Sequence, residues 1–235
     1  MCARYTLARE IAEVVRMIVC VNLLKSFAPR YNIAPHQSAP VIVREAGTTE
    51  LRMLRWGLVP SWSKDEGIGN KLINARMETI MEKASFRSAW KSRHCLIPAD
   101  GFYEWLSTSS GKIPHRFTMR DGAAFCFAGL WERWHPPAAS QGDLFVAAPQ
   151  EQTPVDTFTI ITAPANSLVA DLHDRMPVIL APSDYELWLD SSSPAQKLAA
   201  ILCPFDADKM RRTRVSTRVN SSRVEGPDCI VEALN

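Results

Sequence analysis

Proline is spread through the whole chain and limits the length of any regular element. The 235 residues include 16 prolines, and these do not cluster. The usual frequency is only about 5%. Because proline interrupts helices and central strands, we expect short elements joined by many turns and no long helix. The length suits one sizeable globular domain, or at most two small ones.

The hydrophobic pattern of the N-terminal part predicts a helix followed by a hairpin. Thr6 is a candidate helix cap, and the apolar residues between positions 7 and 19 recur at helical spacing. Residues 40–45 (PVIVRE) and 51–56 (LRMLRW) predict paired strands, with Gly47 in the turn between them. A more helical pattern returns at residues 73–84.

The middle and the C-terminal part favour short strands. Strands are expected at residues 95–98, 101–106, 115–119, 124–130 and 158–162, with turns at 109–111 and 121–122. Four prolines predict a surface loop at residues 134–154. Two short helices are expected at residues 182–189 and 194–202, and a final strand at 211–219. We therefore predict one α+β domain over residues 1–235, with a β-rich, mixed or antiparallel barrel-like core and peripheral helices.

The net charge does not identify a class of partner, whereas the cysteine spacing argues against a zinc site. The net charge of +2 does not require a polyanion as partner, yet it allows a local basic groove. The six cysteines are scattered, with no C-x-x-C pair and no histidine at a zinc-binding spacing. We expect reduced cysteines in the interior, no metal and no organic cofactor.

The short apolar run at residues 17–24 does not have the pattern of a secretory signal peptide. Charged residues precede it, no small-residue cleavage site follows, and no stretch reaches the roughly 18 to 20 apolar residues of a membrane span. The expected location is cytoplasmic, in association with the nucleoid, and no membrane partner is expected.

Cys2 follows the initiator methionine and offers a specific chemistry. A small residue at position 2 permits removal of Met1, which would leave an α-amine beside the cysteine thiol. Such an amine has a pKa of about 7.7 to 8.0 and can condense with an aldehyde. The thiol can then add to the imine carbon and close a five-membered thiazolidine. The alternative is that Cys2 is an ordinary residue of a frayed terminus.

Two further clusters carry polar groups near aromatic residues. Asn74 and Arg76 offer an amide and a guanidinium, while Trp62, in a predicted exposed turn, offers a face for an unpaired base; Trp56 reads as core. Glu104 lies in the aromatic run at residues 101–105, where burial would raise its pKa, unless strand alternation places it on a wet face.

His173 and Arg175 are two residues apart in a predicted extended segment, so their side chains point the same way. One could transfer protons while the other neutralises a phosphate. A histidine in such a position can equally be structural.

These clusters together resemble the SRAP family, the SOS response-associated peptidases or abasic-site processing proteins. The matching segments are Cys2 and Arg4, then residues 30–35 (RYNIAP), 55–62 (RWGLVPSW), 73–79 (INARMET), 86–90, 95–100, 101–105 (GFYEW) and 173–177 (HDRMP). The resemblance spans almost the whole chain and preserves the order of the segments.

The resemblance implies an activity and a role for each site residue. It implies that Cys2, once N-terminal, forms a thiazolidine with the open-chain aldehyde of an abasic site in single-stranded DNA. Asn74 would orient Cys2, Glu104 would transfer protons, and His173 would assist opening of the sugar ring. The resemblance further assigns DNA contacts to Arg4, Pro35, Trp62, Arg76, Trp105 and Arg175.

Two positions depart from the family pattern. Ala3 replaces the usual glycine and restricts φ where the backbone tucks closely. Ser63 stands where the bacterial pattern has a second tryptophan, so weaker stacking of bases is expected. Two other functions stay open: a cysteine peptidase with Cys2 as nucleophile, which could also release Met1, and a non-covalent single-strand binding module in which Cys2 has no role.

Overall fold

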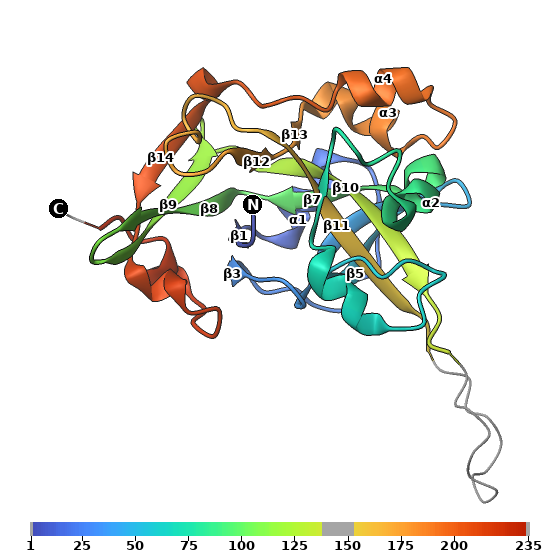
Figure 1. The fold of residues 1–235 in the computed structure, drawn as a ribbon, viewed down its shortest axis with the longest axis horizontal. Coiled ribbons are helices and arrows are strands. Elements are labelled where there is room, and N and C mark those ends of the chain that lie inside the picture. The colour runs from blue at the N-terminus through green and yellow to red at the C-terminus, as the bar shows by residue number, and fades with distance from the viewer. Residues whose placement is uncertain (1, 138–152, 234–235) are drawn as a thin grey trace, which may run out of the picture.

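The computed structural model describes residues 2–137 and 153–233, which form two β-sheets with short helices around them (Figure 1). The smaller sheet has five antiparallel strands in the order β14-β9-β8-β1-β3. Its strands are β1 (Tyr5–Leu7), β3 (Arg30–Ile33), β8 (Gly101–Thr108), β9 (Gly111–Met119) and β14 (Met210–Arg214). The short N-terminal strand β1 therefore lies inside this sheet, between β8 and β3.

The larger sheet follows the order β12-β11-β10-β7-β4-β5-β2, with β13 paired to β10 and β6 paired to β11. Trp56 in β5 pairs in parallel with Phe158 in β11. Strands β11, β10, β7, β4 and β5 therefore form a closed ring. This closure confirms the predicted mixed, barrel-like core. The strands are β2 (Val21–Asn22), β4 (Ser38–Glu45), β5 (Thr48–Trp56), β6 (Asn74–Arg76), β7 (His94–Ala99), β10 (Phe125–Trp134), β11 (Val155–Pro164), β12 (Arg175–Pro177) and β13 (Ile179–Leu180).

The helices are short and lie outside the sheets, as the spread of prolines predicts (Figure 1). The α-helices are α1 (Ile11–Met17), α2 (Ala84–Ser92), α3 (Tyr185–Leu189) and α4 (Ala195–Ala200). Short 3-10 helices are η1 (Glu66–Lys71), η2 (Pro182–Asp184), η3 (Ala207–Lys209), η4 (Thr217–Asn220) and η5 (Pro227–Cys229). Within the described residues, no helix has the length and apolar character to cross a bilayer.

An aromatic cluster joins the two sheets beneath β1. The ring of Tyr5, from the smaller sheet, lies 5.3 Å from the ring of Trp56 and 5.7 Å from that of Phe127, both in the larger sheet. Trp56 stacks in turn on Phe158 at 6.1 Å. All four side chains are fully buried. Because edge and offset contacts between aromatic rings add to the free energy of burial, this cluster fixes where the N-terminal strand lies.

The hairpin predicted around Gly47 is confirmed. Residues Ser38–Glu45 pair with Thr48–Trp56, and Ala46 and Gly47 have φ values of 50° and 81°. Two successive positive φ angles are those of a type I′ turn, which matches the twist of the flanking strands. The strands predicted in the middle of the chain and at 158–162, and the two late helices, are confirmed as well.

Four predictions of local structure are wrong, two in the N-terminal half and two further along the chain. Thr6 does not cap a helix: it lies in β1, its buried hydroxyl bonds Asp100, and the helix begins only at Ile11. Residues 73–84 form β6 and a series of turns, because pairing of β6 with β11 overrides the helical pattern.

The predicted final strand at 211–219 ends early. β14 stops at Arg214, and the chain then turns into η4. Most of the surface loop predicted at 134–154 lies outside the described residues. Trp134 itself ends β10 and is buried, so the predicted loop begins too early.

Candidate active site

Cys2 is buried beside the start of β1. Its side chain is 0% exposed, so the alternative of a frayed terminus is wrong. Its Sγ lies 3.9 Å from the carbonyl oxygen of Arg4, and its own carbonyl accepts a hydrogen bond of 2.8 Å from Nδ2 of Asn74. Asn74 is placed by the parallel pairing of β6 with β11. Strand β6 of the larger sheet thus holds the backbone of Cys2, which lies just before β1 of the smaller sheet.

The environment of Cys2 keeps its thiol protonated. Burial, together with the nearby charge of Glu104, raises the pKa of the thiol to about 12. Since the thiolate is the reactive form of cysteine, this thiol needs a base before it can attack. The reactivity of Cys2 therefore depends on a neighbouring proton acceptor.

Glu104 lies in β8 and is 5% exposed. Burial raises the pKa of its carboxyl group to about 7, and the negative charge of Asp174 acts in the same direction. The alternative that strand alternation places Glu104 on a wet face is therefore wrong. A carboxyl group that populates both protonation states near neutrality can both donate and accept a proton during a reaction.

His173 precedes β12 and is part-buried. Its Nδ1 accepts a hydrogen bond of 2.9 Å from the backbone N–H of Arg175, although Oδ1 of Asp174 also lies 2.8 Å from the same atom. Burial lowers the pKa of His173. The neutral imidazole is therefore favoured near neutral pH.

A cavity of about 460 Å³ brings the two titrating groups together. Glu104 and His173 both line it, and Arg4 and Trp105 form part of its wall. Across residues 2–137 and 153–233, no three His, Cys, Asp or Glu side chains gather closely enough to hold a metal ion. The lining residues are Ala3, Arg4, Glu104, Trp105, Ser107, Lys112, Leu172, His173 and Asn220.

The segment after β14 fixes the wall of this cavity. Arg4 donates from Nη1 to Oδ1 of Asn32 at 2.6 Å and to the carbonyl of Val219 at 2.9 Å, and its guanidinium lies 5.7 Å from the ring centre of Trp105. The indole N–H of Trp105 donates to Oδ1 of Asn220 at 2.7 Å. Both side chains are oriented before any ligand arrives, which reduces the entropy lost on binding.

Arg175 and Arg76 lie on the two strands that flank the end of β11, but their environments differ. Arg175 is buried, and its guanidinium donates to both carboxylate oxygens of Glu78, at 2.5 and 2.9 Å, and to the carbonyl of Thr162 at 2.5 Å. These hydrogen bonds lower the pKa of Glu78. Arg76 is exposed at the end of β6.

Pro35 and Trp62 do not line the cavity. Pro35 follows β3 and is part-exposed, whereas Trp62 follows β5 in a turn and is 57% exposed. The predicted contrast with Trp56, which is fully buried, is confirmed. The exposed indole of Trp62 can contact a ligand only outside the cavity.

The two departures from the family pattern fit the fold without strain. Among the described non-glycine residues, positive φ occurs only at His36 and Ala46, so the backbone of Ala3 does not require glycine. Ser63 is buried: its hydroxyl donates to the carbonyl of Asp65 at 2.8 Å, and its own carbonyl accepts from Trp134 at 2.7 Å. The serine thus fixes the loop after Trp62.

Four lining residues were not predicted from the sequence: Ser107, Lys112, Leu172 and Asn220. Lys112 lies beside the predicted turn at 109–111, and its positive charge lowers the pKa of Glu104. Among these four residues, only Lys112 lies at a place that the predicted hairpin turn could have pointed out. Asn220 is far from the other site residues in the sequence, and no spacing points to it.

Comparison with known proteins identifies relatives over nearly the full length. A family model described as SOS response associated peptidase (SRAP) matches residues 1–222. The abasic site processing protein YoqW of Bacillus subtilis is 41% identical over 98% of this chain and 99% of its own. The abasic site processing protein HMCES of Gallus gallus is 31% identical over 87% of this chain and 66% of its own.

Solved structures share the same architecture. A crystal structure of a protein from Bacteroides thetaiotaomicron superposes with a TM-score of 0.84 at 26% identity, covering 99% of this chain and 100% of that one. A second, from Bordetella bronchiseptica, has a TM-score of 0.73 at 28% identity, covering 92% of this chain and 100% of that one. The mixed α+β fold is therefore shared with these proteins.

Proposed function

The chain belongs to the SOS response associated peptidase (SRAP) family, and on that premise we propose that it captures abasic sites in single-stranded DNA through a covalent bond to Cys2. Relatives at 41% and 31% identity carry the name abasic site processing protein. The observation that carries the proposal is the position of Cys2: buried, held by Asn74, and close enough to Glu104 for that carboxyl to shift the pKa of the thiol.

Removal of Met1 is the first step. Hydrolysis of the bond between Met1 and Cys2 consumes one water and releases the α-amine of Cys2. We propose that the chain performs this cleavage on itself, with the Cys2 thiol as nucleophile on the preceding carbonyl and Glu104 as the group that accepts and returns the proton. The peptidase in the family name would then describe self-processing.

The α-amine reacts next. Its lone pair attacks the aldehyde carbon of the ring-opened sugar and forms a carbinolamine, which loses water to give an imine. This dehydration needs a proton donor at the departing hydroxyl. Glu104 with a pKa near 7 suits that task in its protonated form. His173, with a neutral imidazole that can donate and accept a proton, would assist the earlier opening of the sugar ring.

The thiol then closes the ring. Because burial keeps this thiol protonated, its proton must pass to a base as sulfur bonds to the imine carbon. Glu104 is ionised once it has protonated the hydroxyl that departs as water, and the imine forms with its nitrogen still protonated. Glu104 then accepts the thiol proton and regains its starting form, while the C=N electron pair moves onto the nitrogen as sulfur bonds to carbon. The product is a thiazolidine, and one water has left overall.

The DNA strand would follow the basic and aromatic residues around the cavity. Arg4 and Trp105 lie in its wall, while exposed Arg76 and Trp62 are available for phosphates and unstacked bases beyond it. Pro35 completes the proposed DNA path, and the buried Arg175 supports it from within the fold through its hydrogen bonds to Glu78 and Thr162. A cytoplasmic, nucleoid-associated location fits this role.

Two alternative functions make different demands on Cys2. A general peptidase would have to admit a substrate peptide to a thiol that is 0% exposed and strongly protonated. A non-covalent binding module would use the same arginines and tryptophans and would leave Cys2 without a task.

The test combines intact mass and a denaturing gel. Purified protein is incubated with a single-stranded oligonucleotide that carries one abasic site. We expect a mass that lacks Met1 and a band shift that survives heating. Cys2→Ser is the matched variant, used as the fraction whose intact mass lacks Met1, because that fraction has the free amine and differs from the parent only in sulfur: it should give an imine that borohydride traps but heat destroys.

Three other results would favour other functions. A retained Met1 with no stable band would contradict the covalent proposal. Turnover of peptides without any band would favour a peptidase. Equal, salt-sensitive binding of intact and abasic strands, unchanged in Cys2→Ala, would favour the non-covalent module.

A further inference from the structure

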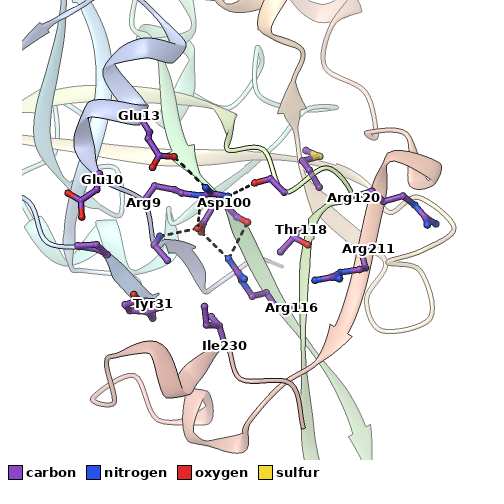
Figure 2. A pocket seen from close by; sticks show the side chains of 14 residues that line it. Arg9, Glu10, Glu13, Tyr31, Asp100, Arg116, Thr118, Arg120, Arg211 and Ile230 are labelled. Atoms are coloured by element: carbon purple, nitrogen blue, oxygen red, sulfur yellow. Dashed lines mark hydrogen bonds and ion pairs between the residues drawn. The ribbon is translucent and has the colours of Figure 1, made fainter. Parts of the chain in front are cut away.

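A second cavity, drawn in Figure 2, lies beside the five-stranded sheet and is not lined by Glu104. Side chains alternate between the two faces of a strand. Glu104 lies directly opposite His115 on β9, so the neighbouring Arg116 and Thr118 point to the other face. Arg211 on β14 lies opposite Thr118. The cavity of about 540 Å³ is within the range of small-molecule sites.

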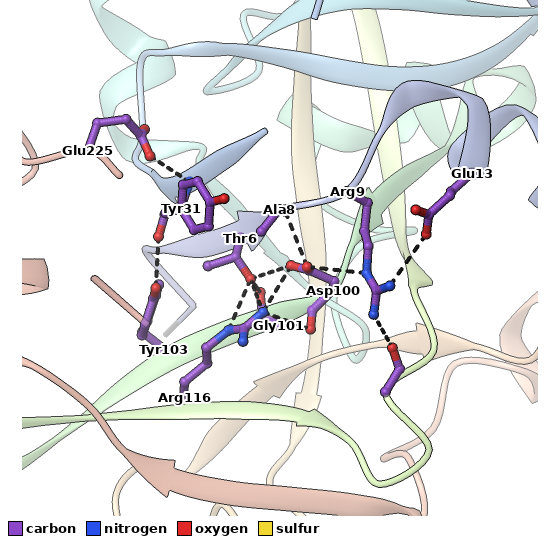
Figure 3. A network of polar contacts seen from close by, with 11 residues as sticks. Thr6, Ala8, Arg9, Glu13, Tyr31, Asp100, Gly101, Tyr103, Arg116 and Glu225 are labelled. Atoms are coloured by element: carbon purple, nitrogen blue, oxygen red, sulfur yellow. Dashed lines mark hydrogen bonds and ion pairs between the residues drawn. The ribbon is translucent and has the colours of Figure 1, made fainter. Parts of the chain in front are cut away.

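Its floor is a network of charged and polar groups centred on Asp100 (Figure 3). The carboxylate of Asp100 accepts hydrogen bonds from the hydroxyl of Thr6 at 2.5 Å and from the backbone N–H of Ala8 at 3.2 Å. Arg116 lies 3.1 Å away and Arg9 lies 3.7 Å away, both as ion-pair partners. The single buried carboxylate is thus matched by two guanidinium groups.

The contacts of Arg116 orient its guanidinium. Nε and Nη2 donate to the hydroxyl of Thr6, at 3.3 and 2.9 Å, and Nη2 also donates to the carbonyl of Asp100 at 3.2 Å. Nη1 takes part in none of these contacts. A planar guanidinium fixed along one edge presents its remaining N–H groups in a defined direction, which is how arginine recognises phosphate oxygens.

Arg211 adds a positive charge that the network does not use. Figure 2 shows its side chain extending toward Thr118 and Arg116, whereas Arg120 points away from Asp100. In the part of the chain that the structure describes, Arg211 is in no ion pair, while Arg9 pairs with Glu13. The wall of the cavity formed by β9 and β14 thus offers two guanidinium groups and a hydroxyl.

The opposite wall is apolar and aromatic. Tyr31, Pro29 and Ile230 line it. The backbone of Tyr31 is fixed on both sides: its carbonyl accepts from the hydroxyl of Tyr103 at 2.7 Å, and its N–H donates to Glu225 at 2.5 Å. The backbone that carries the Tyr31 ring is therefore held in place, and the ring lines the same cavity as the guanidinium groups, where it can contact the flat face of a base.

We propose that this cavity binds a nucleotide through its phosphate monoester. Arg211, Arg116 and the hydroxyl of Thr118 hold the phosphate, and the base lies against Tyr31. The exposed carboxylate of Glu10, at the rim, disfavours a second anionic group there. The site goes beyond the proposed function, because it lies on the other face of the sheet and does not require Cys2 to react.

The phosphate could come from a free nucleotide or from a phosphorylated end of a DNA strand. Calorimetry on the full chain at low salt, with deoxyadenosine monophosphate, deoxyadenosine and inorganic phosphate as probes, tests the shared chemistry. We expect binding of the monophosphate, weaker binding of phosphate, and no binding of the nucleoside. Arg211→Gln should weaken the monophosphate about tenfold or more, and Thr118→Val should weaken it by less.

Arg87→Gln is the matched control, since Arg87 is an exposed arginine on α2, away from the cavity. It should leave binding unchanged, and the melting temperature of each variant should stay that of the parent. Arg211→Gln should also keep the rate of capture of an abasic oligonucleotide. No heat of binding up to about 10 mM monophosphate, or equal binding by Arg211→Gln and Arg87→Gln, would overturn the proposal.

Two oligonucleotides without abasic sites, one with a 5′-phosphate and one with a 5′-hydroxyl, separate the two sources. If the phosphorylated strand binds more tightly and Arg211→Gln removes that gain, the ligand is a strand end. If the two strands bind alike while the free monophosphate binds in an Arg211-dependent way, the ligand is a free nucleotide. Both results support the site.

Discussion

The side-chain amide of Asn74 donates a 2.8 Å hydrogen bond to the carbonyl of Cys2, a residue 72 positions earlier. Asn74 belongs to the larger sheet through β6, and Cys2 leads into the smaller one through β1. The bond therefore fixes the backbone of Cys2 relative to the larger sheet. The proposed reaction needs this, because the proton-transfer group must reach both the α-amine and the thiol of Cys2.

Asn74→Ala should slow formation of the covalent adduct about tenfold, because a misplaced amine loses the orientation that this hydrogen bond supplies. Gel-based kinetics on an abasic oligonucleotide would measure the rate. Asn74→Asp removes the donor while keeping the size, and it should be at least as slow. A rate equal to the parent in both variants would show that Asn74 does not position Cys2.

Glu104 makes stability depend on pH. Its pKa is raised from 4.5 to about 7 in the folded chain, so the folded state favours the protonated form. The stabilisation is complete below about pH 4.5 and is lost as the pH rises through about 7, by roughly 3 kcal/mol. Glu104→Gln should therefore melt at a higher temperature than the parent near pH 8, and the difference should shrink toward pH 5. A constant difference across this range would contradict the raised pKa.

Glu104→Gln should also show whether the carboxyl group takes part in the reaction, because the variant is expected to fold but cannot transfer a proton. Without a titrating carboxyl group, adduct formation should slow by about a hundredfold, within the usual range for a proton-transfer residue. Met1 should be retained in a larger fraction of the purified protein, as measured by intact mass. Full removal of Met1 in this variant would assign that step to another enzyme.

Arg175 is predicted to act on stability more than on DNA affinity. Its guanidinium is buried and engaged by Glu78 and Thr162. Arg175→Ala should lower the free energy of unfolding by about 1 to 3 kcal/mol, since it removes the packing of a buried side chain, its hydrogen bond to Thr162 and its ion pair with the exposed carboxylate of Glu78. Denaturant unfolding measures this loss. An unfolding free energy equal to the parent, with weaker DNA binding, would instead assign Arg175 to phosphate.

Arg76 offers the opposite case. It is exposed at the end of β6, so Arg76→Gln should leave the melting temperature unchanged. If it contacts one phosphate, the slope of the logarithm of the binding constant for a single strand against the logarithm of salt concentration should fall by about 0.7. Fluorescence anisotropy at several salt concentrations would measure it, with Arg87→Gln as the control that keeps the parent slope.

Local patterns predicted the fold class and most strands, and they failed where distant pairing decides the structure. Gly47 marks a turn that neighbouring residues specify. Thr6 and residues 73–84 have helix-compatible patterns, but β1 and β6 find partners far along the chain. No sequence window contains those partners, so the pairing that overrides local preference was not predictable.

The candidate site shows the same limit. The residues themselves suggested Glu104 and its raised pKa, whereas roles for Cys2, Asn74 and His173 came mainly from the family resemblance. Asn220 was missed, because nothing in the sequence around it indicates that it accepts a hydrogen bond from the distant Trp105. The cavity on the opposite face was missed for the same reason: its walls come from β9, β14 and the start of β3.

The place of β1 inside its sheet also sets an order of events during protein synthesis. Tyr5 pairs with Ile33 on one side and with Phe102 on the other. The second partner does not exist until the ribosome has passed residue 102. During that interval the nascent chain carries Cys2 without its cover, and the thiol that is buried in the finished fold is exposed to oxidants in solution.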